Sequence, residues 1–256
     1  MNERMPVVFI GHGTPMNAIE DNRWSQAWRD LARDLPRPRA IVCVSAHWYR
    51  RGTAVTAMSR PPTIHDFGGF PPALFNMAYP APGDPALAQR IIDLLAPESV
   101  AADLDWGLDH GAWSVLCHLY PDADIPVVQV AIDRLREPAF HYALGQRLRA
   151  LRDEGVLLLA SGNVVHNLRA LRMGGPAHPW AERFEATVRR LVADGEHAAL
   201  VDYPALGADA ALSIPTPDHY LPLLYALGAS DANETPLFPV TGIDGGALSM
   251  LSVRWG

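Results

Sequence analysis

Residues 40–48 read AIVCVSAHW, a β-branched apolar run that ends in a small polar residue and a histidine. Two other stretches have the same form: VVFIGHG over residues 7–13 and LLLASGNVVH over residues 157–166. Short, continuously apolar runs of this kind are typical of strands buried on both faces of a parallel sheet. In such a sheet, ligands bind at the carboxyl ends of the strands. The sequence therefore predicts that histidines collect at that edge.

The rest of the chain alternates strand patterns with longer amphipathic helix patterns. Strands are expected at Val7–Ile10, Ala40–Ser45, Thr53–Ala57, Val127–Ile132, Val156–Ala160, Leu237–Val240 and Leu248–Val253. Helices are expected at Asn22–Asp34, Ala86–Leu95, Gly111–Tyr120, Ala139–Arg152, Trp180–Ala193 and Tyr220–Leu227. This alternation predicts one α/β domain over residues 1–256, with a mainly parallel central sheet and helices on both faces. The Gly- and Pro-rich segments are interpreted as loops of that domain and not as linkers.

Composition excludes several classes of partner. Hydrophobic residues make up 49% of the 256 residues and charged residues 19%, which is typical of a globular protein with a large core. The net charge is −7 and no run is rich in arginine, so neither nucleic acid nor an anionic membrane is an expected partner. No apolar stretch approaches the ~18 residues of a membrane span, and residues 7–10 are too short a run for a signal peptide.

The cysteine content fits a reducing compartment. Cys43 and Cys117 both lie in apolar runs and are interpreted as small buried hydrophobic residues, not as a disulfide or as metal ligands. A cytoplasmic location is therefore expected.

Four histidines are candidates for a common metal site. His12, His47 and His166 each follow a predicted strand, and His219 lies at a loop-to-helix junction in PTPDHYLP. Neutral imidazole is a frequent ligand of zinc and iron. There is no HExxH or CxxC motif, so the residues alone leave a shared site and unrelated histidines both open. Four further histidines are interpreted as ordinary surface or core residues: His118, His141, His178 and His197.

Two loops carry further candidates. Asp109 precedes His110-Gly-Ala-Trp and is expected to cap the helix that follows. The segment IHDFGGFP places Phe67 and Phe70 around a Gly-Gly pair. An ordinary loop accounts for this segment, but an aromatic lid over a flat substrate better explains why two phenylalanines lie in a loop.

Eight segments in order now resemble a known family. They are GHGTPMNAIED, VSAHW, PPTIHDFGGFP, YPAPGDPALAQR, LDHGAWSVL, YPDADIPVVQV, ASGNVVHNLR and PTPDHYLPLLYALG. Together they resemble the class III extradiol ring-cleaving dioxygenases, and within these the 4,5-DOPA branch, over residues 5–253. The resemblance implies an α/β fold with one mononuclear metal site at the carboxyl edge of the sheet. It also implies opening of a catechol ring by O2 beside the two hydroxyl groups.

The resemblance also implies roles for individual residues. His12 and His47 match two metal ligands, and His219 matches the third. His166 matches the acid/base histidine beside the metal and is counted among the groups that can reach the ion. His110 matches a second catalytic histidine that bonds the substrate or the bound oxygen.

Further expectations concern the surroundings of the metal. His65, Phe67 and Phe70 are expected to contact the substrate. Asp218 is expected to orient its neighbour and not to replace it as ligand, although many extradiol enzymes use two histidines and a carboxylate. His166 is expected to have a pKa near its ordinary ~6.5, suited to accepting and returning a proton.

The expected cofactor is one divalent metal ion, and the expected partners are a small-molecule catechol and O2. Fe(II) is expected for turnover, because zinc cannot carry electrons between catechol and O2. Zn²⁺ can occupy the same site in isolated protein, because it binds such ligands more tightly. Two alternatives remain: a zinc-dependent hydrolase with His166 as general base, and a non-catalytic metal- or peptide-binding protein on the same fold.

Overall fold

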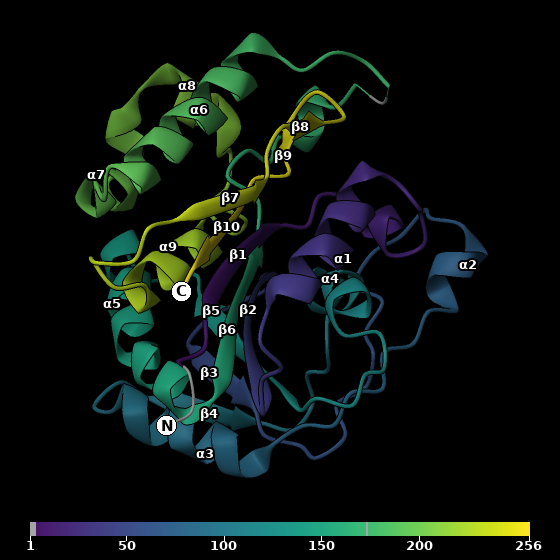
Figure 1. The fold of residues 1–256 in the computed structure, drawn as a ribbon, viewed down its shortest axis with the longest axis vertical. Helices are drawn as coiled ribbons and strands as arrows, with labels where there is room; N and C mark the ends of the chain where they lie inside the picture. Colours follow the sequence, from purple (N-terminus) through teal and green to yellow (C-terminus); the bar gives the residue numbers. More distant parts are fainter. Residues whose placement is uncertain (1–3, 173) are drawn as a thin grey trace.

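An eight-stranded sheet in the order β4-β3-β5-β2-β6-β1-β10-β7 forms the centre of the molecule. The computed structural model describes residues 4–172 and 174–256 and is drawn in Figure 1. The strands are β1 Val7–Gly11, β2 Ala40–Arg50, β3 Thr53–Thr56, β4 Val100–Asp103, β5 Val127–Asp133, β6 Val156–Gly162, β7 Leu237–Val240 and β10 Ser252–Trp255. A separate two-stranded sheet joins β8 Ile243–Asp244 to β9 Leu248–Ser249.

The helices fill the connections between these strands. They are α1 Arg23–Asp34, α2 Pro72–Phe75, α3 Pro85–Leu95, α4 His110–Leu119, α5 Pro138–Leu148, α6 Pro179–Ala193, α7 His197–Val201, α8 Ala208–Ser213 and α9 Leu221–Ala229. Four 3₁₀ turns accompany them at Pro15–Ala18, Arg149–Glu154, Leu168–Ala170 and Tyr203–Leu206.

The pairing of the strands confirms the predicted mainly parallel sheet. The four central strands β5, β2, β6 and β1 run parallel to one another. Antiparallel pairs occur toward the edges, where β10 joins β1 and β7, and β3 joins β5. Parallel central strands direct all their carboxyl ends to one edge, as the ligand-binding edge of an α/β sheet requires.

Helices cover both faces of the sheet, as predicted, because successive side chains of each strand point to opposite faces. Val8 and Ile10 of β1 belong to the core cluster that includes residues of α1 and α4. Val7 and Phe9 belong to the cluster that includes residues of α5, α6 and α9. In Figure 1, α1 and α4 accordingly lie on one side of the central strands, and α5 and α9 lie on the other.

Several predicted boundaries were wrong. The strand expected over Leu248–Val253 is divided between β9 and β10, since the chain passes there from the small sheet to the large one. Strand β4 was not predicted because its half-exposed VAAD sequence carries little apolar signal. The helix expected to reach Arg152 ends at Leu148 and continues as a 3₁₀ turn, which Gly155 closes at a φ of 76°. Helices α2, α7 and α8 are too short to show a helical period.

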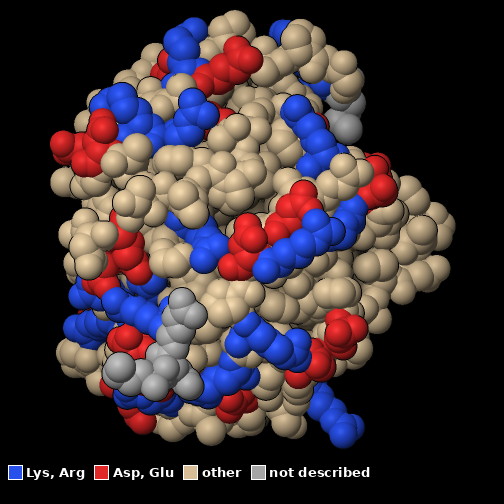
Figure 2. Space-filling view, in the orientation of Figure 1, with Lys and Arg blue, Asp and Glu red and all other residues tan. Residues whose placement is uncertain are grey.

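The surface carries both signs of charge. Figure 2 shows acidic and basic side chains beside one another on one face, without a continuous basic area. One arginine differs from the rest: Arg152 is fully buried, pairs with Glu234 and also bonds the carbonyls of Met5 and Ala229. Within residues 4–172 and 174–256, no helix combines the length and the apolar character needed to cross a membrane.

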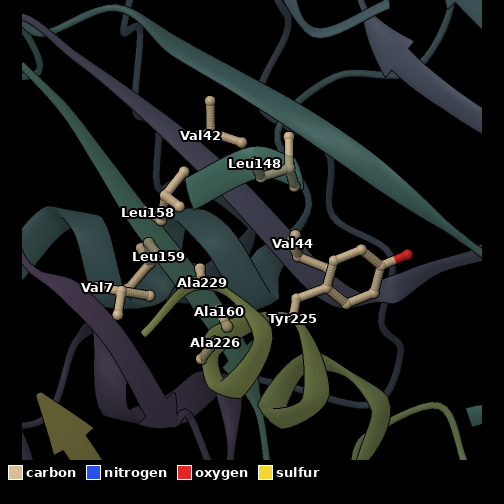
Figure 3. A pocket seen from close by; sticks show the side chains of 10 residues that line it. All are labelled: Val7, Val42, Val44, Leu148, Leu158, Leu159, Ala160, Tyr225, Ala226 and Ala229. Atoms are coloured by element: carbon tan, nitrogen blue, oxygen red, sulfur yellow. The ribbon is translucent and has the colours of Figure 1, made fainter. Parts of the chain in front are cut away.

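A small void lies in the core between the sheet and helices α5 and α9. Its volume is about 10 Å³, and its walls include Val7, Val44 and Leu158 (Figure 3). Tyr225 also lines it, but the hydroxyl group points away from the other side chains in Figure 3 and lies 3.0 Å from His141 Nδ1. A space of this size with apolar walls offers a water molecule no partners, so it is a packing defect and not a binding site.

Candidate metal and substrate site

A larger cavity opens at the carboxyl edge of the sheet. Its volume is about 360 Å³, within the ~300–1,000 Å³ range of small-molecule sites. The walls are formed by His12, Gly13, Thr14, Pro15, Met16, His47, Phe67, Phe70, His110, His166, Leu168, Leu171, His219, Asp244 and Leu248. The cavity thus contains five of the six histidines to which the sequence analysis gave roles, all but His65, together with a mostly apolar wall.

The secondary structure brings these five side chains together from distant parts of the chain. His12 directly follows β1, and its N–H donates to the carbonyl of Gly162 at the end of β6. His166 follows β6, and His219 lies just before α9. His110 is the first residue of α4. The sheet edge therefore collects groups that lie up to about two hundred residues apart.

His47 differs from the prediction because it lies within a strand. Strand β2 was expected to end at Ser45 but continues to Arg50. Its register with β5 shifts between Val44 and Tyr49, on either side of this histidine. An irregularity of this kind redirects a side chain at a strand end, and here the His47 side chain lies in the cavity wall.

Two glycines allow backbone elements to approach the histidines closely. A Cβ atom at Gly111 would lie 2.8 Å from Cδ2 of His47 and 2.5 Å from Oγ of Ser45. A Cβ atom at Gly162 would lie 2.2 Å from the carbonyl oxygen of His219. Any larger residue at either position would displace a histidine of the cavity.

Three of the rings form a nearly equilateral triangle. The ring centres of His12 and His47 are 5.1 Å apart, those of His12 and His219 are 5.2 Å apart, and those of His47 and His219 are 5.0 Å apart. Three imidazoles on one tetrahedral ion have ring centres about 5 Å apart when each nitrogen lies ~2.1 Å from the ion. The triangle therefore has the dimensions of a three-histidine metal site.

The other two histidines flank this triangle. The His166 ring stacks on the His219 ring with centres 3.4 Å apart and planes within 5°. The His110 ring lies 3.8 Å from the His47 ring but 6.0 Å from the His12 ring. Ring nitrogens of His12, His47 and His110 all lie within 4.8 Å of one another, and so do ligand atoms of His166, Asp218 and His219.

Polar partners hold the outer nitrogens of two triangle residues. His12 Nδ1 lies 2.9 Å from Oγ of Ser161, whose hydroxyl donates to the carbonyl of Gly111 at 2.5 Å. His219 Nδ1 is hydrogen-bonded to the Asp218 carboxylate. Because a carboxylate and an already donating hydroxyl can only accept here, both Nδ1 atoms carry the proton. The Nε2 lone pairs are thus free to bind a metal ion, the usual effect of such outer partners.

The inner nitrogens lack ordinary partners. Nε2 of His12 carries a lone pair and no proton. It lies 3.3 Å from Nε2 of His47, which is also an inner ring nitrogen. His219 Nε2 is buried and has no hydrogen-bond partner among the described residues. A divalent cation would give such nitrogens a partner, and ligand atoms of His12, His47 and His110 lie within 4.8 Å of one another, so the residues present fit a metal ion.

Electrostatics keep two of the three rings neutral at pH 7. Burial and the neighbouring histidines hold the pKa of His12 well below its ordinary value. Burial likewise lowers the pKa of His219 to about 4, although the bond to Asp218 opposes the shift. For His47, burial lowers the pKa, but the Asp66 and Asp109 carboxylates outweigh it, and the net shift is upward. Metal ions bind the neutral form of imidazole, which His12 and His219 already hold.

The expectation of an ordinary pKa for His166 was wrong. Burial, with the His219 ring stacked against it, lowers the pKa of His166 to about 2. The sequence could not reveal this shift, because it arises first from burial and then from the His219 ring that the fold places 3.4 Å away.

The three residues expected to contact the substrate lie in two environments. Phe67 and Phe70 line the cavity, with ring centres 5.4 Å apart. His65 is not among the lining residues: its Nε2 lies 2.9 Å from the carbonyl of Met77, and its ring packs behind Phe67. The His65 ring is thus held by the backbone of Met77 and packs against Phe67 and Trp113, and its contact with the substrate stays a prediction.

Asp66 belongs to the site although the sequence analysis overlooked it. Its carboxylate lies 3.2 Å from His47 Nδ1 and 3.0 Å from His110 Nδ1. Burial opposes ionisation, but the two histidines outweigh it and hold the pKa of Asp66 below its usual range. The only signal in the sequence was its position between two candidates, His65 and Phe67.

Other interpretations are confirmed. Asp109 caps α4 by accepting from the N–H of Ala112, and its carboxylate also accepts from Ser45 and from Gln129. Both cysteines are free thiols, but only Cys43 is buried as expected, whereas Cys117 is half-buried. The remaining histidines have polar contacts outside the cavity: His118, His141, His178 and His197.

Comparison with known proteins gives consistent results. The profile of the family described as "Catalytic LigB subunit of aromatic ring-opening dioxygenase" matches residues 6–243. A protein of Escherichia coli (strain K12) described as "4,5-DOPA dioxygenase extradiol" is 56% identical over 99% of this chain and 95% of its own length. A protein of Beta vulgaris with the same description is 39% identical over 96% of this chain and 95% of its own. The crystal structure of an uncharacterized E. coli K12 protein has a TM-score of 0.87 at 50% identity, covering 99% of this chain and 100% of that one.

The chain therefore belongs to the LigB family of aromatic ring-opening dioxygenases, that is, to the class III extradiol enzymes. Within this family it falls in the branch of the 4,5-DOPA extradiol dioxygenases. The resemblance inferred from the eight segments is confirmed. The protein is an enzyme that opens an aromatic ring with O2, and its histidine cluster together with the family indicates a metal ion.

Proposed function

We propose that this enzyme opens the ring of a DOPA-like catechol beside its two hydroxyl groups, at one Fe(II) ion held by His12, His47 and His219. The observation that carries the proposal is the near-equilateral triangle of these rings, with spacings of 5.0–5.2 Å. The free Nε2 lone pairs of His12 and His219 support the same ligand set.

Each ligand also has an outer partner that fixes its orientation. Ser161, Asp66 and Asp218 lie against the Nδ1 atoms of His12, His47 and His219 respectively. When bound, Fe(II) supplies the positive charge that acidifies a diol and the one-electron chemistry that lets O2 react with it. Zn²⁺ fits the same three nitrogens without supplying that redox chemistry.

His166 is proposed as the proton-transfer residue. It lies in the cavity wall, and its ring stacks on a proposed ligand, so a substrate at the ion would lie within its reach. Burial and the stacked His219 ring lower the pKa of His166, so the ring is neutral at pH 7 and carries a nitrogen lone pair.

His110 is proposed to donate a hydrogen bond to the substrate or to oxygen. The residue lies on the cavity wall beside His47, and only 5% of it is exposed. Phe67 and Phe70 line the same cavity and offer an apolar wall for a flat ring. Their burial of the ring would exclude water from the reacting atoms, which strengthens every polar interaction there.

The cavity wall suggests which substituents the catechol carries. Its lining residues include one carboxylate, Asp244, and no arginine, and the whole chain has no lysine. A neutral or amine-bearing side chain therefore suits the wall better than an isolated carboxylate group. DOPA, named in the descriptions of the relatives, carries an amine and a carboxylate, of which only the amine meets an oppositely charged group in the wall, Asp244.

Anaerobic reconstitution with Fe(II), followed by oxygen-uptake and absorbance measurements on a panel of catechols, tests the proposal. The enzyme should consume one O2 per catechol and form a yellow semialdehyde or its cyclised product. Resorcinol, whose hydroxyls are not adjacent, and Zn²⁺-loaded enzyme serve as inactive controls. Ester or amide hydrolysis by the Zn²⁺ form without O2 would instead establish the hydrolase alternative.

A further inference from the structure

The histidine cavity is larger than one aromatic ring needs. An apolar cavity of ~150 Å³ is enough to hold benzene inside a protein. The cavity at the sheet edge has a volume of about 360 Å³. A catechol ring with its two hydroxyl groups therefore leaves space for a substituent, and the part of the wall that this substituent meets decides which catechols bind well.

Two leucines form an apolar wall beside His166. Leu168 begins the 3₁₀ turn Leu168–Ala170, Leu171 follows this turn, and both side chains line the cavity. The N–H of Leu171 donates to the carbonyl of Leu168 at 3.4 Å, and side chains three residues apart lie one above the other in such a turn. Leu248 adds to this wall, because it pairs with His166 in an antiparallel bridge and also lines the cavity.

Backbone hydrogen bonds at both ends hold the turn against the loop between β8 and β9. The N–H of Asn167 donates to the carbonyl of Ala247 at 3.2 Å, and the N–H of Arg172 donates to the carbonyl of Gly245 at 2.7 Å. The two leucines therefore lie on a backbone that is already fixed. A substituent that contacts them meets a preformed surface and does not have to order a loop.

Leu168 is unusual because it is exposed. Of the large apolar side chains that are exposed among residues 4–172 and 174–256, it is the one that lines the cavity, and 59% of it is accessible to solvent. An apolar group that covers such a side chain removes apolar surface from water, which is favourable. A charged group at the same place would lose hydration without gaining a partner. This part of the wall thus favours an alkyl or aryl group.

We propose that Leu168 and Leu171 form a subsite for an apolar substituent, and that the substrates of this enzyme include catechols with an alkyl or aryl group on the ring. The subsite depends on the proposed function for its meaning, since the proposed function places the ring at the histidines. Asp244 is paired with Leu248 across β8 and β9, so an amine and an apolar group would approach neighbouring parts of one wall.

Calorimetric titration of the Zn²⁺-loaded enzyme under argon tests the subsite without turnover. The probes are 4-methylcatechol and 4-butylcatechol, and the measured quantity is the ratio of their dissociation constants. Chelation and ring contacts are common to both compounds and cancel in this ratio. Each CH2 group that leaves water raises affinity by up to ~4-fold, so wild type should bind the butyl compound ~10- to 50-fold more tightly than the methyl compound.

The decisive variant is Leu168→Asn, which replaces the apolar side chain by a polar one of similar size. Its ratio should fall to ~3-fold or less, because the butyl group no longer meets an apolar surface. Leu171→Asn is a second variant and should shift the ratio in the same direction. Leu135→Asn is the matched control, because Leu135 is 58% exposed but does not line the cavity, and it should keep the wild-type ratio. Circular dichroism checks that each variant is folded.

Two results would overturn the subsite. One is a wild-type enzyme that binds both compounds equally well. The other is a wild-type ratio that persists in folded Leu168→Asn and Leu171→Asn. The proposed function fails separately, if Fe(II)-loaded wild type opens no catechol. The preference for the butyl compound and its loss in Leu168→Asn would then still establish the subsite as a binding site.

Discussion

The histidine cavity and the core void border the same strands but differ in every other respect. The void touches the faces of β1, β2 and β6, has a volume of about 10 Å³, and is lined almost entirely by aliphatic side chains. The cavity lies at the carboxyl ends of the same strands, has a volume of about 360 Å³, and contains five histidines. On the faces, helices cover the side chains and close the packing. At the carboxyl ends of the strands, loops meet, and they hold polar side chains around a cavity that packing does not fill.

The comparison separates stability from chemistry. Side chains on the strand faces contribute burial free energy and dispersion contacts, and they have no reacting atoms nearby. Groups at the strand ends are also buried, but several of their polar atoms are unpaired, as His219 Nε2 is. Changes at the ends should therefore alter binding and turnover, whereas changes on the faces should alter unfolding.

The largest effect is expected for the three triangle histidines. His219→Ala should abolish stoichiometric metal binding, because two remaining imidazoles cannot complete a three-histidine site. Metal analysis of purified protein after Fe(II) or Zn²⁺ loading measures it. His197→Ala, outside the cavity, is the control and should bind metal as wild type does. Full occupancy in His219→Ala would remove this residue from the ligand set.

A large effect on turnover alone is expected for His166. His166→Ala should keep most of its metal and still show the absorbance change of catechol binding. Its turnover should fall by ~100- to 10,000-fold, the usual contribution of a positioned proton-transfer group. Loss of metal would make His166 a ligand. Near-normal turnover would leave it without the assigned role.

The matching change on the strand face should affect stability only. Leu158→Ala enlarges the core void and should lower the free energy of unfolding by ~2–5 kcal/mol, measured by urea titration. Metal bound per folded molecule should stay at the wild-type level, since Leu158 lies away from the cavity wall. A lower metal affinity of the folded protein would show that the two regions are coupled.

A smaller effect is expected for the carboxylate beside His219. Asp218→Asn should retain the metal and reduce turnover by ~10- to 100-fold, since the side chain orients a ligand through Nδ1. Steady-state kinetics and metal analysis of the same preparation measure both quantities. If this variant fails to hold metal at all, Asp218 is itself a ligand.

The smallest effect is expected for Asp244. Asp244→Asn should reduce kcat/KM for an amine-bearing catechol by ~2- to 5-fold, the contribution of one half-exposed ion pair. The kcat/KM for neutral 4-ethylcatechol should not change, which makes that substrate the internal control. An equal loss for both substrates would mean that Asp244 acts on the shape of the cavity and not on charge.

The sequence alone determined much of this arrangement. The apolar runs before His12, His47 and His166 predicted parallel strands whose ends meet at one edge, and that inference needs only the period of a strand and the direction of its chain. Asp109 before His110 predicted a capped helix from local hydrogen bonding alone. Eight segments in order were enough to indicate the family.

Only the tertiary structure decided how these groups act on one another. The low pKa of His166 depends on its burial and on the His219 ring stacked 3.4 Å away. The contacts of Asp66 with His47 and His110 join three separate segments of the chain, and Nε2 of His65 lies 2.9 Å from the carbonyl oxygen of Met77. Strand β4 and the break before β10 likewise depend on neighbouring segments. Local pattern fixes which elements form, but side-chain contacts between distant segments depend on distances of a few ångströms, which no spacing along the chain encodes.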